Sequence, residues 1–212
     1  MPVQGVEIGS SLLTGLIYVI IILISLSFHE FAHAFVANIF GDPTAKLDGR
    51  LSLNPVNHWD PIGTTMLVVL TFLNSFGLNL PIFGWGKPVP IDERNFDNPK
   101  MHGLQAALAG PMSNLILAAV IAAIMKYTSL PNIADQFLVM AVYLNIFLMF
   151  FNILPIPPLD GSRLLRLILP DGVYYSLTTN FVAYFIMIFV TIFFLLDYVM
   201  VLSVRLTTIL VG

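Results

Sequence analysis

The sequence contains no cysteine and very little charge. Without cysteine there can be no disulfide framework and no thiolate metal site, so any bound metal has to use histidine and carboxylate ligands. Charged residues make up 10% of the 212 residues and hydrophobic residues 58%, a balance that is typical of a membrane protein. The net charge of −3 provides no basic surface, and nothing in the sequence indicates nucleic-acid binding.

No Lys or Arg precedes the first apolar run, and that run is too long to be the hydrophobic part of a signal peptide. We therefore expect the first helix to remain in the mature protein. The sequence shows no internal repeat, low-complexity tract or appended soluble domain. It is expected to form one domain over residues 1–212.

Four apolar segments are long enough to cross a bilayer as helices. They cover residues 10–40, 103–126, 133–154 and 173–211, and it is open whether the last one is a single helix or two. Small residues near the start of the second segment, among them Gly110, would let another helix pack closely. The predicted fold is an all-α polytopic membrane protein with about four spanning helices.

Two further segments are predicted not to span. In residues 44–54 leucines alternate with polar residues around Asp48-Gly49, a favoured two-residue hairpin loop. This pattern predicts a short β-hairpin at the membrane surface, although a simple connector fits about as well. The apolar part of residues 62–84 is interrupted by polar residues, glycine and proline and is too short to cross. It is predicted to be a re-entrant segment.

Residues 29–33 read His-Glu-Phe-Ala-His, and they lie inside the first apolar segment. Ionisable groups at membrane depth are expensive and are read as functional by default. On a helix, His29 and His33 are one turn apart, so both imidazoles face the same side and can share a metal ion. In such a site Glu30 would be the general base that takes a proton from water.

A catalytic zinc commonly takes three protein ligands. The candidates for the third are His58, His102 and the carboxylates. Asp160 is favoured because it follows a spanning segment within the proline-broken residues 155–161, and irregular backbone is tolerated at membrane depth only where it is buried or lines a cavity. The alternative is that Asp160 is a turn residue of an Asp-Gly pair. For His58 a surface or capping role is the favoured interpretation, and His102 is expected to be structural.

The third ligand also constrains the topology. Asp160 and His33 can meet only near the same membrane face, so the chain must cross an even number of times between them. Residues 103–126 and 133–154 provide two crossings if residues 62–84 turn back. Most of the nine Lys and Arg residues then share one face, which the positive-inside rule makes cytoplasmic: Lys46, Arg50, Lys87, Arg94, Lys100, Arg163 and Arg166.

Taken together, these motifs resemble the site-2 proteases, the intramembrane zinc metalloproteases of peptidase family M50. The resemblance is closest to small prokaryotic members without a PDZ or CBS domain. The matching segments are residues 29–33, 49–55, 58–63, 84–90, 109–114 and 152–161.

The resemblance implies an enzyme with one Zn²⁺ per chain, bound by His29, His33 and Asp160, with Glu30 as the catalytic base. It also implies that Asn152 and Asn114 line the site and support the substrate or the oxyanion. The expected reaction is hydrolysis of a peptide bond in or near the transmembrane segment of a membrane protein substrate.

Several expectations go with this function, and two alternatives stay open. The expected partners are transmembrane substrates and the lipid bilayer, and the expected location is the plasma membrane with the active site toward the cytoplasm. A membrane metal or ion transporter could also use an intramembrane cluster of His, Glu and Asp. A catalytically dead scaffold is disfavoured by the intact metal set with Glu30. Asn152 could instead only hold the proline-rich loop. The sequence does not indicate the substrate or the oligomeric state.

Overall fold

The structure is a computed structural model that describes residues 12–128 and 131–212. These residues form helices and connecting segments, with no β-strand among them. Four helices are long and apolar enough to cross a membrane: Leu12–Ile39, Pro99–Tyr127, Ala134–Asn152 and Phe193–Val211. The prediction of an all-α chain with four candidate spans is confirmed. The first two residues of the predicted segment 10–40 lie outside the described residues.

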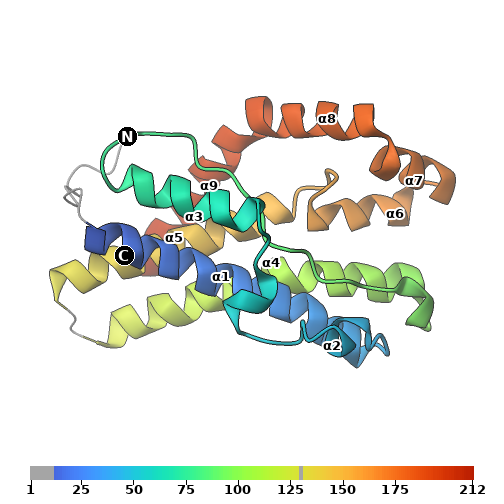
Figure 1. Ribbon diagram of the computed structural model, residues 1–212, viewed down its shortest axis with the longest axis horizontal. Helices are drawn as coiled ribbons and strands as arrows, with labels where there is room; N and C mark the ends of the chain where they lie inside the picture. The colour runs from blue at the N-terminus through green and yellow to red at the C-terminus, as the bar shows by residue number, and fades with distance from the viewer. Residues whose placement is uncertain (1–11, 129–130) are drawn as a thin grey trace.

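The long helices pack as a bundle along the long axis of the molecule (Figure 1). Helix α1 (Leu12–Ile39) lies against α4 (Pro99–Tyr127), α4 lies against α5 (Asn132–Asn152), and α5 lies against α9 (Leu196–Val211). A buried apolar core joins α4 and α5, and leucines of α9 pack on it: Ala118, Ala122, Val142, Ile146, Leu206 and Leu210. The bundle therefore buries small and branched side chains between its helices.

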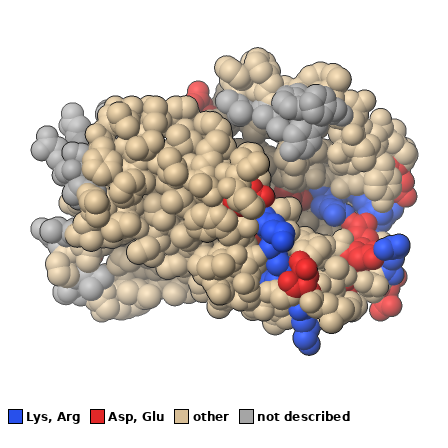
Figure 2. All heavy atoms as spheres, viewed as in Figure 1, with Lys and Arg blue, Asp and Glu red and all other residues tan. Residues whose placement is uncertain are grey.

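The outside of the bundle is apolar, as expected for a surface that faces lipid. Helix α1 alone exposes a row of large hydrophobic side chains: Leu12, Leu13, Leu16, Ile20, Ile24, Phe28, Phe35 and Ile39. On the face shown in Figure 2, the charged side chains gather almost entirely in one half of the molecule, and the other half is nearly free of charge. An exposed apolar surface of this extent is stable only in contact with lipid or protein. The chain is therefore a multi-pass membrane protein.

The C-terminal end of α1 is tied to the loop before α4. Gly41 ends the helix in the left-handed region at φ 98°, which glycine adopts without strain. Asp42 is fully buried, and its carboxylate accepts hydrogen bonds from Asn95 Nδ2 and from the backbone N–H of Asp92, both at 2.8 Å. Burial raises the pKa of Asp42, but its hydrogen bonds, including those from Thr44, outweigh this and hold the pKa below its ordinary value. The loop that carries Glu93 is thereby fixed beside α1.

The predicted β-hairpin over residues 44–54 is wrong. The structure has the one-turn helix α2 (Thr44–Leu47), followed by turns. A type I′ hairpin loop requires positive φ at both central residues, but Asp48 has φ −81° and only Gly49, at φ 69°, is in that region. The pair Asp48-Gly49 ends a helix instead, and the N–H of Arg50 donates to Ala45 O at 2.8 Å.

The re-entrant segment predicted over residues 62–84 is not supported as such. The structure shows a 12-residue helix, α3 (Gly63–Asn74), packed along α1, and then an irregular return. The N–H of Lys87 donates to His58 O at 2.9 Å, so the residues just before and just after this segment lie side by side. The position of this segment relative to lipid stays a prediction.

The last predicted segment, residues 173–211, is divided into several elements. After the short helix α6 (Leu165–Ile168), which precedes the segment, helices α7 (Asp171–Thr179) and α8 (Phe181–Val190) are followed by a π-helical turn, η4 (Thr191–Leu195), which leads into α9. The break between α7 and α8 falls at Asn180, whose side chain accepts from the N–H groups of Val182 and Ala183. Within this segment only Phe193–Val211 is long and apolar enough to span.

Candidate metal centre

Helix α1 presents two imidazoles on the side that packs against α4. His29 and His33 are 5% and 6% exposed, and their Nε2 atoms lie 3.0 Å apart. This is the geometry expected for residues one helical turn apart on the same face. The two nitrogens therefore point at one position inside the protein.

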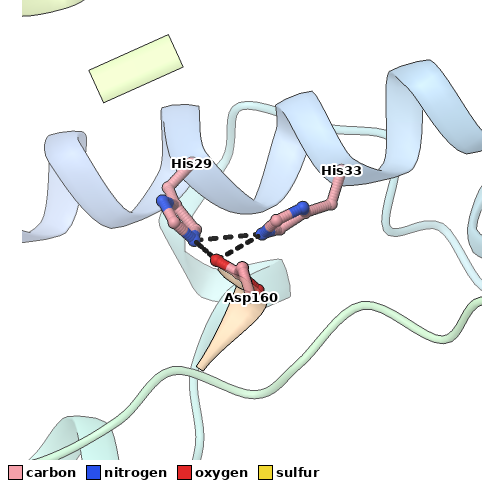
Figure 3. A group of neighbouring side chains, drawn as sticks. All are labelled: His29, His33 and Asp160. Carbon is pink, nitrogen blue, oxygen red and sulfur yellow. Dashed lines mark hydrogen bonds and ion pairs between the residues drawn. The ribbon is translucent and has the colours of Figure 1, made fainter. Parts of the chain in front are cut away.

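Asp160 completes a group of three. It is the first residue of η3 (Asp160–Leu164), and its Oδ2 lies 3.0 Å from His29 Nε2 and 3.4 Å from His33 Nε2 (Figure 3). Among the described residues, this is the group of His and acidic side chains that could hold a metal ion. The structure thus brings together three of the residues predicted from the sequence.

The three atoms fit a zinc ion. Ligand atoms at about 2.1 Å from a tetrahedral zinc lie roughly 3.4 Å from one another, close to the separations observed here. Asp160 Oδ2 is buried and accepts no hydrogen bond within the described part of the chain. Two imidazoles and a carboxylate form a donor set that catalytic zinc sites use, with a further position left for water or substrate.

The outer nitrogen of each imidazole is held by α4. His29 Nδ1 lies 2.6 Å from Asn114 Oδ1, and His33 Nδ1 lies 2.8 Å from the backbone oxygen of Ala106. Both partners are oxygen acceptors, so each Nδ1 carries a proton, and in the neutral imidazole the lone pair is then on Nε2. Such outer partners commonly orient metal-binding histidines. Asn114 therefore lies behind His29, where it can orient the ligand; its predicted contact with substrate stays a prediction.

Gly110 of α4 leaves the space that the imidazoles occupy. A methyl group at this position would lie 2.7 Å from His29 Cε1 and closer still to His33 Nε2. The sequence placed Gly110 among small residues that favour helix packing, but it did not link this residue to the metal centre. A close helix approach at a small residue was the available signal.

Glu30 follows His29 and contacts a different element. Its Oε2 accepts a hydrogen bond of 3.1 Å from the backbone N–H of Val89. The residues before Val89 are fixed by Arg50, a buried residue (3% exposed) whose guanidinium donates to the backbone oxygens of Lys87, Pro88 and Asn57. The proposed base is thus partly buried and held by an irregular segment that a buried cation supports. Sequence reasoning did not find this role of Arg50.

The loop that carries Asp160 is also held at two points. Gly161 packs so closely against Ile153 that a side chain could not be accommodated. Arg163 and Arg166 then form ion pairs with Glu93 of η2 (Glu93–Asn95). Since η2 is fixed beside α1 through Asp42, these contacts connect the third ligand to the helix that carries the other two.

The remaining candidates lie outside the metal group. His58 is buried, and its Nε2 forms a hydrogen bond of 2.6 Å with Ser52 O. His102 stacks on Phe40 with ring centroids 4.3 Å apart. Asn152 donates to Leu148 O, one turn back in α5, at 3.0 Å. The structural interpretation of His102 agrees with its contact. The surface interpretation of His58 is wrong, because this residue is buried and its ring is held by a backbone oxygen. The substrate-supporting role of Asn152 stays a prediction.

The site belongs to a membrane protein in which two histidines of a spanning helix and a distant aspartate can hold a metal. Comparison with known proteins identifies its family. The chain is 40% identical to YwhC of Bacillus subtilis over 169 residues, which are 76% of this chain and 72% of that protein. It is 33% identical to Rip2 of Mycobacterium tuberculosis over 146 residues, 68% of this chain and 54% of Rip2.

A third relative is zinc metalloprotease MJ0392 of Methanocaldococcus jannaschii, which is 25% identical over 179 residues, 84% of this chain and 42% of that protein. YwhC and Rip2 carry zinc metalloprotease names too. The model of peptidase family M50 matches residues 127–196, which include Asp160. No solved structure matches the chain. The chain belongs to peptidase family M50, the site-2 protease family, and is a zinc metalloprotease.

Proposed function

We propose that this zinc metalloprotease hydrolyses a peptide bond in or near the transmembrane segment of membrane protein substrates. The observation that carries the proposal is the position of the metal centre within a candidate span. His29 lies ten residues before the end of α1 at Ile39, which is about 15 Å along the helix axis. Because the outside of α1 is apolar, a substrate at this depth would come from within the bilayer.

In this proposal His29, His33 and Asp160 bind the zinc ion, which when bound supplies Lewis-acid chemistry. Glu30 accepts a proton from the attacking water and passes it to the leaving amine. Its contact with the N–H of Val89 holds the carboxylate in one orientation. Asn114 contributes indirectly, by orienting the imidazole of His29.

A decisive experiment compares two purified reporters in lipid vesicles. One contains a single transmembrane segment, and the other has this segment replaced by a soluble linker of equal length. We expect cleavage of the first only, at a bond in or near the segment, as mapped by mass spectrometry. Removing zinc with a chelator should abolish cleavage, and added Zn²⁺ should restore it. Equal cleavage of both reporters would refute the proposed substrate class.

We further propose that the enzyme lies in the plasma membrane with the metal centre toward the cytoplasm. The gathering of charge in one half of the molecule supports this orientation (Figure 2), because positively charged residues favour the cytoplasmic face.

The absence of native cysteine makes the orientation directly testable. Asp97 lies two residues before the start of α4 and Tyr127 is its last residue, and both are exposed. In intact cells a membrane-impermeant maleimide should label Tyr127→Cys and leave Asp97→Cys unlabelled until the cells are opened. The reverse pattern would place the metal centre on the outer side.

The transporter alternative is not favoured. An ion pathway needs polar groups spread along its length, whereas His29, His33 and Asp160 converge on one point. Family membership points to peptide hydrolysis as well.

A further inference from the structure

A chain of buried polar side chains runs from the metal centre into α5. Asn114, Asn145 and Ser25 are 0%, 1% and 1% exposed, and they belong to α4, α5 and α1. Asn114 Nδ2 donates to Asn145 Oδ1 at 2.8 Å, and Asn145 Nδ2 donates to Ser25 Oγ at 2.9 Å. Burying an amide within an apolar bundle costs free energy unless its polar atoms are all hydrogen-bonded. This network of buried side chains therefore calls for an explanation beyond helix packing.

Each amide nitrogen of this network also contacts a backbone oxygen, which can only accept a hydrogen bond. Asn145 Nδ2 also donates to Ala141 O at 2.9 Å, and Asn114 Nδ2 also donates to Ser25 O at 3.3 Å. Turning over the amide of Asn145 would place its oxygen against Ala141 O. Turning over the amide of Asn114 would place its oxygen against Ser25 O and Asn145 Oδ1. The backbone thus permits one orientation of both amides.

This orientation determines which nitrogen of His29 carries the proton. Asn114 Oδ1 is the atom that faces His29 Nδ1 at 2.6 Å, and an oxygen acceptor requires Nδ1 to be the protonated nitrogen. In the neutral imidazole the lone pair is then on Nε2, the atom that faces Asp160 Oδ2 at 3.0 Å. A neutral imidazole in the other tautomer would present a proton to the metal position instead.

We propose that Asn145 is a positioning residue of the zinc centre: through Asn114 it holds His29 in the tautomer whose Nε2 can bind zinc. The inference rests on the proposed role of His29 as a zinc ligand. Ser25 supports Asn145 by accepting one of its protons while its own hydroxyl donates to Ile21 O at 2.8 Å.

Two substitutions of Asn145 distinguish positioning from packing. Asn145→Leu is similar in size and suits an apolar bundle, but it removes the acceptor for Asn114. Asn145→Asp keeps that acceptor, and a buried carboxyl group stays neutral, so its hydroxyl can donate to Ala141 O. We expect Asn145→Leu to weaken zinc binding by about 10- to 100-fold and Asn145→Asp to bind within a few-fold of the wild type. A packing role predicts the opposite order.

The tautomer provides a second readout that needs neither zinc nor activity. The chain has four histidines, so ¹⁵N-histidine solid-state NMR of the zinc-free protein in lipid is tractable, with His29 assigned by His29→Ala. At a pH at which the ring of His29 is neutral, we expect its proton on Nδ1 in the wild type and in Asn145→Asp, and a mixture of tautomers in Asn145→Leu. An unchanged tautomer and unchanged zinc affinity in Asn145→Leu would overturn the proposal, as would equal losses in both variants.

A buried serine outside the hydrogen-bonded network controls for general loosening of the helix packing. Ser203 of α9 is 0% exposed and donates to Val199 O at 2.7 Å, one turn back, as Ser25 does to Ile21 O. Ser203→Ala should leave the tautomer of His29 unchanged, and a change in this variant would show that the NMR signal reports general loosening. If wild type and His29→Ala bind zinc equally, the proposed metal centre fails, while the tautomer measurement still tests the role of Asn145.

Discussion

Changing Glu30 to Gln is expected to abolish measurable proteolysis and to leave zinc bound. The amide oxygen of glutamine can still accept the hydrogen bond from the N–H of Val89, but the amide cannot take a proton from water. General-base catalysis contributes about 10²- to 10⁴-fold, and we expect a loss of this size in the cleavage rate of a transmembrane reporter. Zinc content, measured on the purified protein, should match the wild type because Glu30 is not one of the three converging residues.

Asp48→Asn is the matched control for this substitution. It makes the same carboxylate-to-amide change at an exposed position after α2, and both cleavage and zinc content should be retained. Full activity of Glu30→Gln would contradict the proposed base. Loss of zinc together with activity would assign Glu30 to the metal centre itself.

Changing Gly110 to Ala is expected to destroy the metal centre. The added methyl group would lie 2.7 Å from His29 Cε1 and nearer still to His33 Nε2, and contacts this short cannot persist. The imidazoles cannot turn aside without losing Asn114 and Ala106, and α4 cannot retreat without opening its packing against α1. Overpacking of this kind costs about 1–3 kcal/mol. We expect zinc affinity, measured by competition with a chelator, to fall by at least about 100-fold, beyond the usual effect of a lost outer partner.

Gly172→Ala is the control for this prediction. It adds the same methyl group to a helical glycine of α7 with no neighbouring atom within 4 Å, so zinc affinity and thermal stability should be close to those of the wild type. Zinc binding by Gly110→Ala at wild-type strength would show that the two imidazoles do not hold the metal in the arrangement described.

Much of the site could be predicted from the sequence because its signals are local. The spacing of His29 and His33 places both on one helical face whatever the rest of the chain does. The long apolar runs predict spanning helices, and the absence of cysteine restricts the metal ligands to histidine and carboxylate. Each of these follows from helix geometry, hydropathy or ligand chemistry alone.

Local signals failed where two structures compete for the same residues. The pair Asp48-Gly49 is favoured in a hairpin loop, yet it also suits the end of a helix, and the surroundings select the second use. The one-turn helix α2 is held by Asp42 at its start, and Arg50, just beyond its end, is drawn into the protein by backbone oxygens of the distant residues Lys87 and Pro88. These contacts join segments far apart in the sequence, so periodicity within 44–54 carries no record of them.

The sequence by itself determined that this is an α-helical membrane protein with a two-histidine metal motif in its first helix. The tertiary structure decided how that motif becomes a site. It brought Asp160 to within 3.0 Å of His29, opened the space at Gly110, and placed Asn114 behind an imidazole. The physical reason is that a helix fixes neighbours three and four residues apart, whereas contacts between helices depend on how whole elements pack.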